Sequence, residues 1–478
     1  MIRRKIVVGF LLLLTFSFPS LHAITLEEAR HLLSRAGFGA SPGEINHFLP
    51  ETYEQAVDEI LNTATQAPQT PPPSWATQWN MPSQKPKEMR PEEKMAFEKI
   101  LQNQRLELKA WWYQEMVATP SPVTEHMTLF WHNHFTSSLE KVHWPVLMYR
   151  QNLLLRQYAL GNFQKMLIAI SRDPAMILYL DTQSNHKAQP NENFARELME
   201  LFTLGEGRYT EKDVQEAARA FTGWQVDMKT GNFVERPPQH DDGDKVFLGQ
   251  KGNFEGDNIL YILLTQPRVS EFITEKLWRE FISETPDPQE VKRLATRFRN
   301  NNFEIRPLLR DLFLSPAFRD PKNRGVLTKS PVDLMVGTIR TFNMPIEDTM
   351  PLVVTGKAMG MDLLDPPNVK GWAGGESWIS TYTLLTRRQF LARLLRGKEM
   401  EGHAMNPQSM MTAKDNHDTL HGIDLNDWMG KSGFKDEQDL QAVTAILLPV
   451  PPVDQMPLNA DLPRQIRELV MDPVYQLK

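Results

Sequence analysis

The sequence contains no cysteine among its 478 residues. Disulfide bonds, thiolate metal ligands and a thiol nucleophile are therefore excluded, and any bound metal must be held by His, Asp, Glu, Asn or Tyr side chains. The patterns GxSxG, GxxxxGK[ST] and GxGxxG are also missing, which removes the usual signals of serine hydrolases, nucleotide phosphate sites and dinucleotide sites. Histidines and carboxylates are left as the residues most able to carry chemistry.

Long apolar runs are also scarce, and the chain has no excess of positive charge. Residues 1–23 begin with Arg3, Arg4 and Lys5, continue with a short apolar stretch and end at Ala23, which is the pattern of a cleaved secretory signal. That stretch is shorter than the roughly 20 residues of a membrane-spanning helix, and no later stretch is long enough to span a bilayer. Removal of the segment takes the formal net charge from −6 to −9, which argues against nucleic acid as a partner because phosphate binding needs a basic surface. We expect a periplasmic or secreted protein, with an uncleaved anchor as the alternative.

Helix-start signals recur along the chain. Thr25 with Glu28 and Ser41 with Glu44 stand at capping-box spacing, and Ser330 precedes a proline at the first position of a further helix. Between such starts the apolar residues repeat with the period of a helix. Hydrophobic residues make up 41% of the chain, which is enough for a large core. We predict a mainly α fold, a multi-helix single large domain with a small β-hairpin or loop insertion.

The chain divides by composition into six segments. A β insertion is predicted at about 223–254, where the sequence is rich in Gly, Asn and Asp with short apolar runs. The six predicted segments are a signal peptide at 1–23, N-terminal helices at 24–65, a proline-rich linker at 66–92, a main helical domain at 93–399, a polar mobile loop at 400–440 and a C-terminal helical segment at 441–478.

Polar residues crowd the stretch NENFARELMEL. On a helix Asn193 and Glu197 lie about 40° apart, beside the apolar stripe. A carboxylate on an inward face must be paired, protonated or bound to a metal, so Glu197 and Asn193 are candidate site residues. Arg196 stands four residues from both Glu192 and Glu200 and is able to pair with either. The plainer alternative is that Glu192, Arg196 and Glu200 form a solvated helix face.

Histidines mark two further stretches. EHMTLFWHNHFTSS holds His126, His132 and His134, and the last two diverge by about 200° on a regular helix, so they share an ion only at a fraying helix end. QHDDGDK places His240 beside an acidic turn whose spacing does not match an EF-hand. The alternative is that His132 and His134 are core histidines bonded to backbone carbonyls. A fourth stretch, DPPNVKGWAGGESWIS, suits either close approach to a ligand or the packing of its two tryptophans under a helix.

Six stretches in order, "HLLSRAGFGASPGEI", "FWHNHF", "NENFARELMELFTLGEGRYTEKDVQEAARAFTGW", "HDDGDKVFLGQKGNFEGDNI", "KSPVDL" and "DPPNVKGWAGGESWISTYTLLTRRQF", resemble the bacterial family catalogued as domain of unknown function 1800. The resemblance runs from about residue 24 to the end of the sequence. It implies a large exported bacterial protein, often encoded beside a second exported family that resembles alkaline phosphatases and sulfatases, and it names no reaction. The positions that the family marks are His31, Arg35, His132, His134, Asn191, Glu192, Asn193, Arg196, Glu197, Glu200, Thr222, Gly223, Trp224, His240, Lys245, Gly249, Pro366, Pro367, Asn368, Gly371 and Trp372.

The leading hypothesis is a metal-dependent enzyme, hydrolytic or redox, whose cofactor is zinc, iron or manganese. The predicted metal ligands are His132, His134 and His240. The predicted catalytic residues are Glu197 as the general base, with Asn193 and Arg196 beside it. This hypothesis requires segments far apart in the sequence to meet in one pocket. The alternative is a non-catalytic binding or assembly partner of another exported protein, such as a member of the neighbour family, with the motifs as a polar framework.

Overall fold

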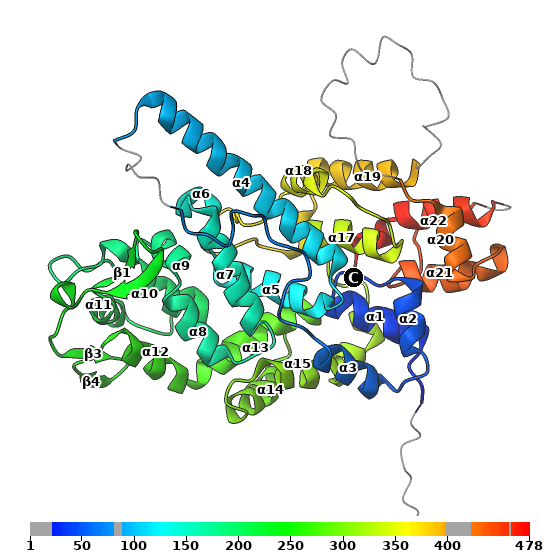
Figure 1. The fold of residues 1–478 in the computed structure, drawn as a ribbon. Helices are drawn as coiled ribbons and strands as arrows, with labels where there is room; N and C mark the ends of the chain where they lie inside the picture. The colour runs from blue at the N-terminus through cyan, green and yellow to red at the C-terminus, as the bar shows by residue number, and fades with distance from the viewer. Residues whose placement is uncertain (1–21, 81–87, 397–421, 458–459) are drawn as a thin grey trace, which may run out of the picture.

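The computed structural model describes residues 22–80, 88–396, 422–457 and 460–478, and these are mainly helical (Figure 1). The helices of the first half are α1 (Leu26–Ala36), α2 (Pro42–Phe48), α3 (Tyr53–Asn62), α4 (Pro91–Ala118), α5 (Pro122–His134), α6 (Leu139–Val142), α7 (Pro145–Tyr158), α8 (Phe163–Ser171), α9 (Pro174–Tyr179), α10 (Asn193–Glu197) and α11 (Glu211–Ala220). Those of the second half are α12 (Gly256–Thr265), α13 (Pro267–Phe281), α14 (Pro288–Asn300), α15 (Ile305–Phe313), α16 (Pro316–Arg319), α17 (Pro331–Thr341), α18 (Met350–Ala358), α19 (Thr381–Arg396), α20 (Leu425–Ser432), α21 (Leu440–Leu447) and α22 (Leu462–Met471). The predicted mainly α fold is confirmed.

The helices begin where local side chains satisfy their first backbone N–H groups. Thr25, Ser41 and Ser330 form capping boxes with the residue three positions later, as predicted from the sequence. Thr52 forms a fourth, at the start of α3. The carboxylate of Asp287 accepts hydrogen bonds from the first N–H groups of α14. These ends are therefore fixed by nearby sequence, without help from distant contacts.

The β insertion consists of two separate hairpins. Strand β1 (Trp224–Asp227) pairs antiparallel with β2 (Asn232–Glu235), and β3 (Lys245–Phe247) pairs antiparallel with β4 (Gln250–Gly252). Leu248 and Gly249 both have positive φ between β3 and β4, as a tight two-residue hairpin turn of the favoured hand requires. The position of the predicted insertion is confirmed, and it holds two short hairpins where one was expected.

Two predicted segments lie partly outside the described residues. The signal peptide falls there except for its last two residues, and so do residues 400–421 of the predicted polar loop. The described remainder of that loop includes helix α20. In the described part of the chain, no helix combines the length and the apolar character that crossing a bilayer demands.

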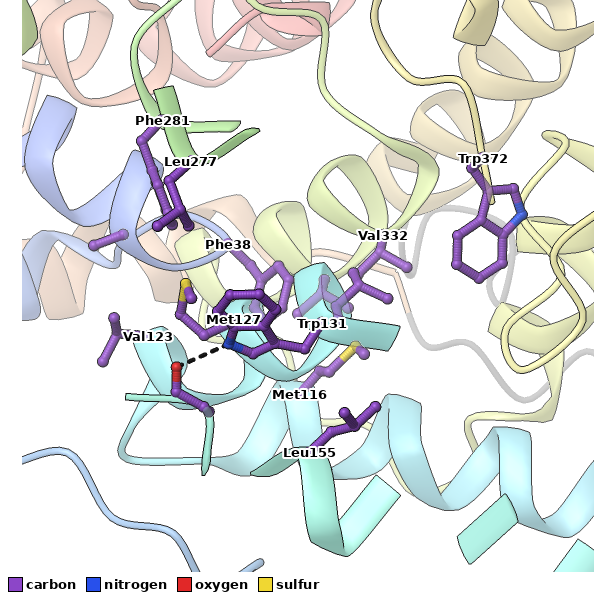
Figure 2. Close-up of a cluster of buried hydrophobic side chains, with 14 of the residues drawn as sticks. Phe38, Met116, Val123, Met127, Trp131, Leu155, Leu277, Phe281, Val332 and Trp372 are labelled. Atoms are coloured by element: carbon purple, nitrogen blue, oxygen red, sulfur yellow. Dashed lines mark hydrogen bonds between the residues drawn. The ribbon is translucent and has the colours of Figure 1, made fainter. Parts of the chain in front are cut away.

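Helix α5 lies at the centre of the core. Figure 2 shows Trp131 of α5 in one apolar cluster with Leu277 of α13 and Val332 of α17, and its indole N–H donates to the carbonyl oxygen of Ala159 at 3.0 Å. Ten of the thirteen residues of α5 are buried, so the helix is enclosed on every side. Every polar side chain on α5 must therefore find its partners inside the protein.

Glu125 shows how such a buried charge on α5 is satisfied. Its carboxylate accepts hydrogen bonds from the guanidinium of Arg156 at 2.7 and 2.8 Å and from the indole N–H of Trp112 at 3.0 Å. Asn152 accepts a further hydrogen bond from Arg156. Since Glu125 and Arg156 are each about 1% exposed, this ion pair links α5 to α7 deep in the core.

Candidate functional site

His134 is buried at the end of α5, where its Nε2 lies 3.1 Å from the carbonyl oxygen of Phe202. A ring nitrogen facing a carbonyl oxygen is the donor, so Nδ1 carries the lone pair. Nδ1 has no hydrogen-bond partner among the described residues. Burial lowers the pKa of His134 well below its usual value, and the nearby Lys276 ammonium adds to this effect. His134 is therefore a neutral imidazole fixed to the main chain.

His132 points into a different environment on the same helix. Its ring lies edge-on to Trp112, with centroids 5.5 Å apart, and 5.8 Å from the ring of Trp372. Its Nε2 is buried and has no hydrogen-bond partner in the described part of the chain. Burial lowers the pKa of His132 to about 3, which keeps the ring neutral.

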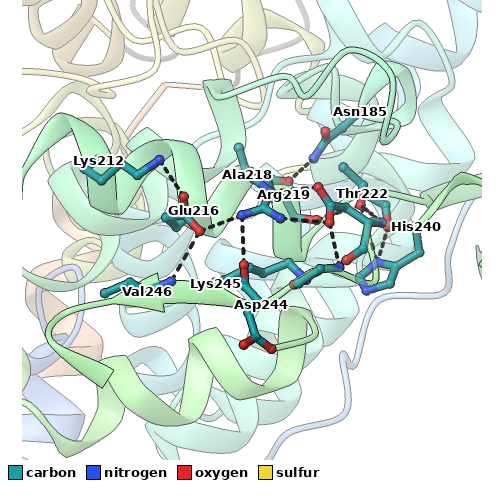
Figure 3. Close-up of polar contacts among 12 residues, drawn as sticks. Asn185, Lys212, Glu216, Ala218, Arg219, Thr222, His240, Asp244, Lys245 and Val246 are labelled. Atoms are coloured by element: carbon teal, nitrogen blue, oxygen red, sulfur yellow. Dashed lines mark hydrogen bonds and ion pairs between the residues drawn. The ribbon is translucent and has the colours of Figure 1, made fainter. Parts of the chain in front are cut away.

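His240 lies in the loop between the two hairpins, at the edge of the polar network in Figure 3. Its Nδ1 is 2.9 Å from the carbonyl oxygen of Thr222. The acidic turn beside it is neutralised by Arg219, which donates to the Asp241 carboxylate at 2.7 and 3.0 Å. This hydrogen bonding lowers the pKa of Asp241. The turn is therefore held by an arginine of α11, and His240 lines a separate pocket of about 230 Å³ next to Trp224.

The fold does not gather the three predicted histidine ligands into one centre. Within the described ranges, the one set of three His, Asp or Glu side chains whose ligand atoms all lie within 4.8 Å is His47, Glu51 and Glu59, near α2 and α3. None of the predicted ligands His132, His134 and His240 belongs to this set, and neither does Glu197. Each of the three histidine rings faces a carbonyl oxygen or aromatic neighbours of its own, and their joint ligation of a metal stays a prediction.

Two of the three predicted catalytic residues are tied into the framework of α10. Asn193 donates from Nδ2 to the carbonyl oxygen of Leu180 at 3.1 Å. Arg196 donates to both carboxylate oxygens of Glu211, at 2.8 and 2.7 Å, and to Glu192 at 3.1 Å, and the hydrogen bond with Glu211 is the main cause of its raised pKa. The pairing with Glu192 follows the predicted spacing, whereas Glu211 belongs to the next helix.

Glu197 differs from these two because its side chain forms no hydrogen bond with the described residues. Burial raises the pKa of its carboxyl group and the nearby Glu200 raises it further, while Arg196 and Lys370 oppose the shift. The side chain is half-buried. A carboxyl group with a raised pKa and no hydrogen-bond partner is typical of functional sites. Lys370, one of the charges that act on Glu197, belongs to the loop of residues 365–378.

The helix widens directly after Glu197. Residues Leu198–Thr203 form a π-helix, whose wider turn is frequent at functional sites. Two side chains from other helices cap the last carbonyl groups of this π-helix. Nζ of Lys276 in α13 lies 3.4 Å from the carbonyl oxygen of Leu201, and Nε2 of His134 in α5 donates to the carbonyl oxygen of Phe202. His134 and Lys276 are thereby brought to the same end of this helix.

A large cavity, of about 550 Å³, lies where α5, α13 and α17 meet the loop of residues 365–378. Its walls come from the motifs FWHNHF, KSPVDL and DPPNVKGWAGGESWIS. The side chains that matter for its chemistry are His126, His134, Lys276, Arg279, Glu280, Glu284, Asp333, Lys370, Trp372, Glu376, Trp378 and Lys478. Cationic and anionic groups are thus equally represented, next to two buried indole rings.

A continuous network of charged groups lines the cavity. His126 has its Nδ1 2.8 Å from the carbonyl oxygen of Gly37 and its Nε2 2.7 Å from the Glu280 carboxylate. Lys478 lies 2.9 Å from Asp333 and 3.6 Å from Glu280. Both ring nitrogens of His126 therefore face hydrogen-bond acceptors, which ties α5 to Glu280 of α13.

The two carboxylates of this network, the buried Asp333 and the partly exposed Glu280, both have lowered pKa values. Burial alone would raise the pKa of Glu280, but the Lys478 ammonium and the hydrogen bond from His126 outweigh it, and the net pKa is lowered. Burial is likewise outweighed at Asp333, where Lys478 and His126 bring the pKa to about 2. Glu280 and Asp333 are therefore carboxylates at neutral pH.

Lys276 is the group in the cavity that is poised to change its protonation. Burial lowers the pKa of its ammonium group to about 8, and the neighbouring Arg279 adds to this shift. Its Nζ lies 5.0 Å from the centre of the Phe272 ring. A lysine with a pKa close to neutrality is able to act as a base or a nucleophile, which an ordinary surface lysine does poorly.

Asn133 fixes the tryptophan wall of the cavity. Its Oδ1 accepts a hydrogen bond from the backbone N–H of Trp372 at 2.7 Å, and its Nδ2 donates to the carbonyl oxygen of Trp372 at 3.3 Å. Gly371 makes this approach possible, because a Cβ atom there would lie 2.1 Å from Oδ1 of Asn133. The asparagine of the HNH triplet, between the two histidines, is therefore the residue that joins this motif to the loop.

Sequence reasoning missed most of the cavity. Lys276, Glu280, Asp333 and Lys478 come from three distant segments, and no spacing in the sequence relates them. The one available signal was the concentration of Gly, Pro and Trp in residues 365–378, which predicted either a ligand-binding loop or a packed turn. The structure shows buried tryptophans that also line a cavity.

Comparison with known proteins gives one match. The family model described as "Protein of unknown function (DUF1800)" matches residues 31–471, which is nearly the whole chain. No curated protein and no solved structure matches the sequence or the fold.

Proposed function

Because the chain belongs to the family described as Protein of unknown function (DUF1800), whose description carries no reaction, we propose from the site geometry that it is an enzyme acting on a small polar molecule in the large cavity. The observation that carries this proposal is convergence. Three of the stretches on which the family resemblance rests, far apart in the sequence, line the same cavity of about 550 Å³. A volume of this size accommodates a ligand of a few hundred daltons.

In the proposed reaction Lys276 transfers a proton to or from the bound molecule. Its pKa of about 8 gives a useful fraction of both protonation states near neutral pH. Glu280, held as a carboxylate between His126 and Lys478, orients polar groups of the ligand or stabilises positive charge that develops on it. Trp372 supplies an apolar wall against which the ligand packs.

A library of small polar metabolites, screened by thermal shift, tests this proposal. A true ligand raises the unfolding midpoint of the wild-type protein and loses this effect in Lys276→Met, while Lys292→Met, at an exposed lysine of α14, behaves like the wild type. Once a substrate is known, Lys276→Met should lower kcat by about 10²–10⁴-fold. A ligand that stabilises Lys276→Met and the wild type equally would place binding elsewhere.

The metal-dependent form of this enzyme, with zinc, iron or manganese, stays a prediction. Its support is the density of histidines and carboxylates in the family-marked stretches. The cavity proposal needs no metal ligand from His132, His134 or His240, which are separately held. Metal analysis of the purified protein by mass spectrometry decides between the two forms, since a metal at one equivalent per chain would favour the metal-dependent one.

A binding role for another exported protein is the second candidate, and one observation favours it. Five apolar side chains are exposed on and beside the adjacent helices α18 and α19, namely Val354, Ile379, Tyr382, Leu384 and Leu385. Such exposed apolar groups mark protein-binding surfaces. Co-purification with the alkaline-phosphatase-like or sulfatase-like neighbour under mild conditions tests this role. Binding that survives the double variant Tyr382→Ser/Leu385→Ser would exclude this surface.

We also propose that the protein is exported to the periplasm or the medium. The support is the basic start, short apolar stretch and small residue of positions 1–23. N-terminal sequencing of protein from a periplasmic fraction should give a chain that begins at Ile24, whereas full-length protein in the cytoplasm would contradict export.

A further inference from the structure

A second, smaller cavity of about 30 Å³ lies beside the large one and shares Asp333 and Lys478 with it. Its other polar lining groups come from α1, from the end of α17 and from the segments before α17 and after α22: Arg30, Ser34, Thr341, Lys329 and Tyr475. A cavity needs about 10–15 Å³ of this kind to hold one water molecule, so the space fits one or two atoms of that size.

Two of the cations that line this cavity have no partner of opposite charge. Arg30 is 5% exposed, and its guanidinium forms no hydrogen bond and no ion pair with the described residues. Lys329 likewise has no carboxylate partner in the described part of the chain, and its Nζ lies over the Tyr475 ring, 4.0 Å from the centre. An arginine donates up to five hydrogen bonds and is not deprotonated in proteins. Burying its charge without an acceptor costs free energy, which a bound anion would offset.

The surroundings of the small cavity increase the excess of positive charge. Arg387 is fully buried and donates to Gln476 and to the carbonyl oxygen of Lys329, which are both uncharged acceptors. Lys478 is already paired with Asp333. Burial, together with repulsion from Arg30, lowers the pKa of Lys329 to about 7. Arg30, Lys329 and Arg387 therefore form no ion pair with the described residues, which leaves positive charge in excess at this place.

We propose that the small cavity binds one small inorganic anion of the size of chloride, held between the Arg30 guanidinium and the Lys329 ammonium. The volume excludes ligands as large as a nucleotide or a sugar phosphate. The hydroxyl groups of Ser34 and Tyr475 also line this cavity, but Ser34 donates to the carbonyl oxygen of His31 and Tyr475 is hydrogen-bonded to Thr338, so the two cations carry the proposed binding. The site is independent of the proposed reaction, although it adjoins the Lys478–Asp333 pair of the large cavity.

Thermal unfolding in sodium chloride and in sodium gluconate, at equal ionic strength, tests the anion site. Gluconate is too large for the cavity, so the midpoint of unfolding should rise along a saturating curve with chloride and stay flat with gluconate. Arg30→Met and Lys329→Met should each weaken the apparent chloride affinity at least about tenfold. Arg208→Met, at an exposed arginine, should keep the wild-type response.

A direct measurement covers the case in which a variant does not fold. Crystals of the wild-type protein soaked in bromide should give an anomalous scattering peak within contact distance of Arg30 and Lys329. No peak at that place would overturn the proposal. An equal unfolding midpoint in both sodium salts, or an unchanged chloride response in a folded Arg30→Met, would overturn it as well.

Discussion

Replacing Asn133 with alanine should loosen the tryptophan wall of the large cavity and leave the rest of the fold intact. The change removes two hydrogen bonds to the backbone of Trp372, of 2.7 and 3.3 Å. Each is expected to contribute about 0.5–1.5 kcal/mol net, so the loop should lose about 1–3 kcal/mol of local stability. Both bonds are local to residues 371–372, so helices α13 and α17 should not feel the loss.

Hydrogen exchange followed by mass spectrometry measures this local loss. Since 1.4 kcal/mol is a factor of ten, peptides that cover residues 371–378 should exchange about 5 to 140 times faster in Asn133→Ala than in the wild type. Peptides from α13 should exchange at the wild-type rate. Asn300→Ala, at an exposed position of α14, is the matched control.

The conservative variant Asn133→Asp separates the two hydrogen bonds. An aspartate keeps an acceptor for the Trp372 N–H and loses the donor to the Trp372 carbonyl oxygen, which then faces a carboxylate oxygen. It should loosen the loop at least as much as alanine does. Unchanged exchange of residues 371–378 in both variants would refute the assignment of Asn133 as the link between the HNH triplet and the loop.

Three further predictions follow from the buried groups. Arg156→Met leaves the Glu125 carboxylate buried without its ion pair and should destabilise the protein by about 3–5 kcal/mol in urea unfolding, and adding Glu125→Gln should restore part of this loss; equal stability of the single and double variants would contradict it. Burial holds the pKa of His132 at about 3 against a usual 6.5, so the unfolded chain binds a proton between these pH values that the folded chain does not bind. The free energy of unfolding should therefore fall by about 4–5 kcal/mol as the pH drops from about 6.5 to 3. His132→Leu should show a shallower pH dependence of urea unfolding. Gly371→Ala puts a Cβ atom 2.1 Å from Asn133 Oδ1 at a φ of +81° and should destabilise the protein by more than about 1 kcal/mol, with a smaller effect when Asn133→Ala is already present; additive effects of the two changes would argue against this contact.

Much of the architecture was predictable because its signals are local. The capping boxes at Thr25, Ser41 and Ser330 each involve side chains three residues apart, so spacing alone identifies the helix starts. The Gly-rich and Asn-rich composition of residues 223–254 located the hairpins for the same reason. Their number depended on which strands pair, and composition does not determine pairing.

The candidate site was less predictable because its groups meet only through tertiary packing. The helical spacing identified Glu197 as unusual, and the structure leaves its side chain without a hydrogen bond to the described residues. The same spacing gave no sign that Arg196 pairs with Glu211 of the next helix. Likewise, His126 and Glu280 stand 154 residues apart in the sequence and 2.7 Å apart in the fold.

The pKa of Lys276 is the most direct test of the proposal that the large cavity is a reaction site. Mass spectrometry of lysine labelling between pH 6 and 11 gives that value for each lysine, with the exposed Lys292 as the internal reference. The burial of Lys276 beside Arg279 predicts half-maximal labelling near pH 8. Labelling that rises only near pH 10.5, the ordinary value for lysine, would contradict its assignment as the group that transfers the proton.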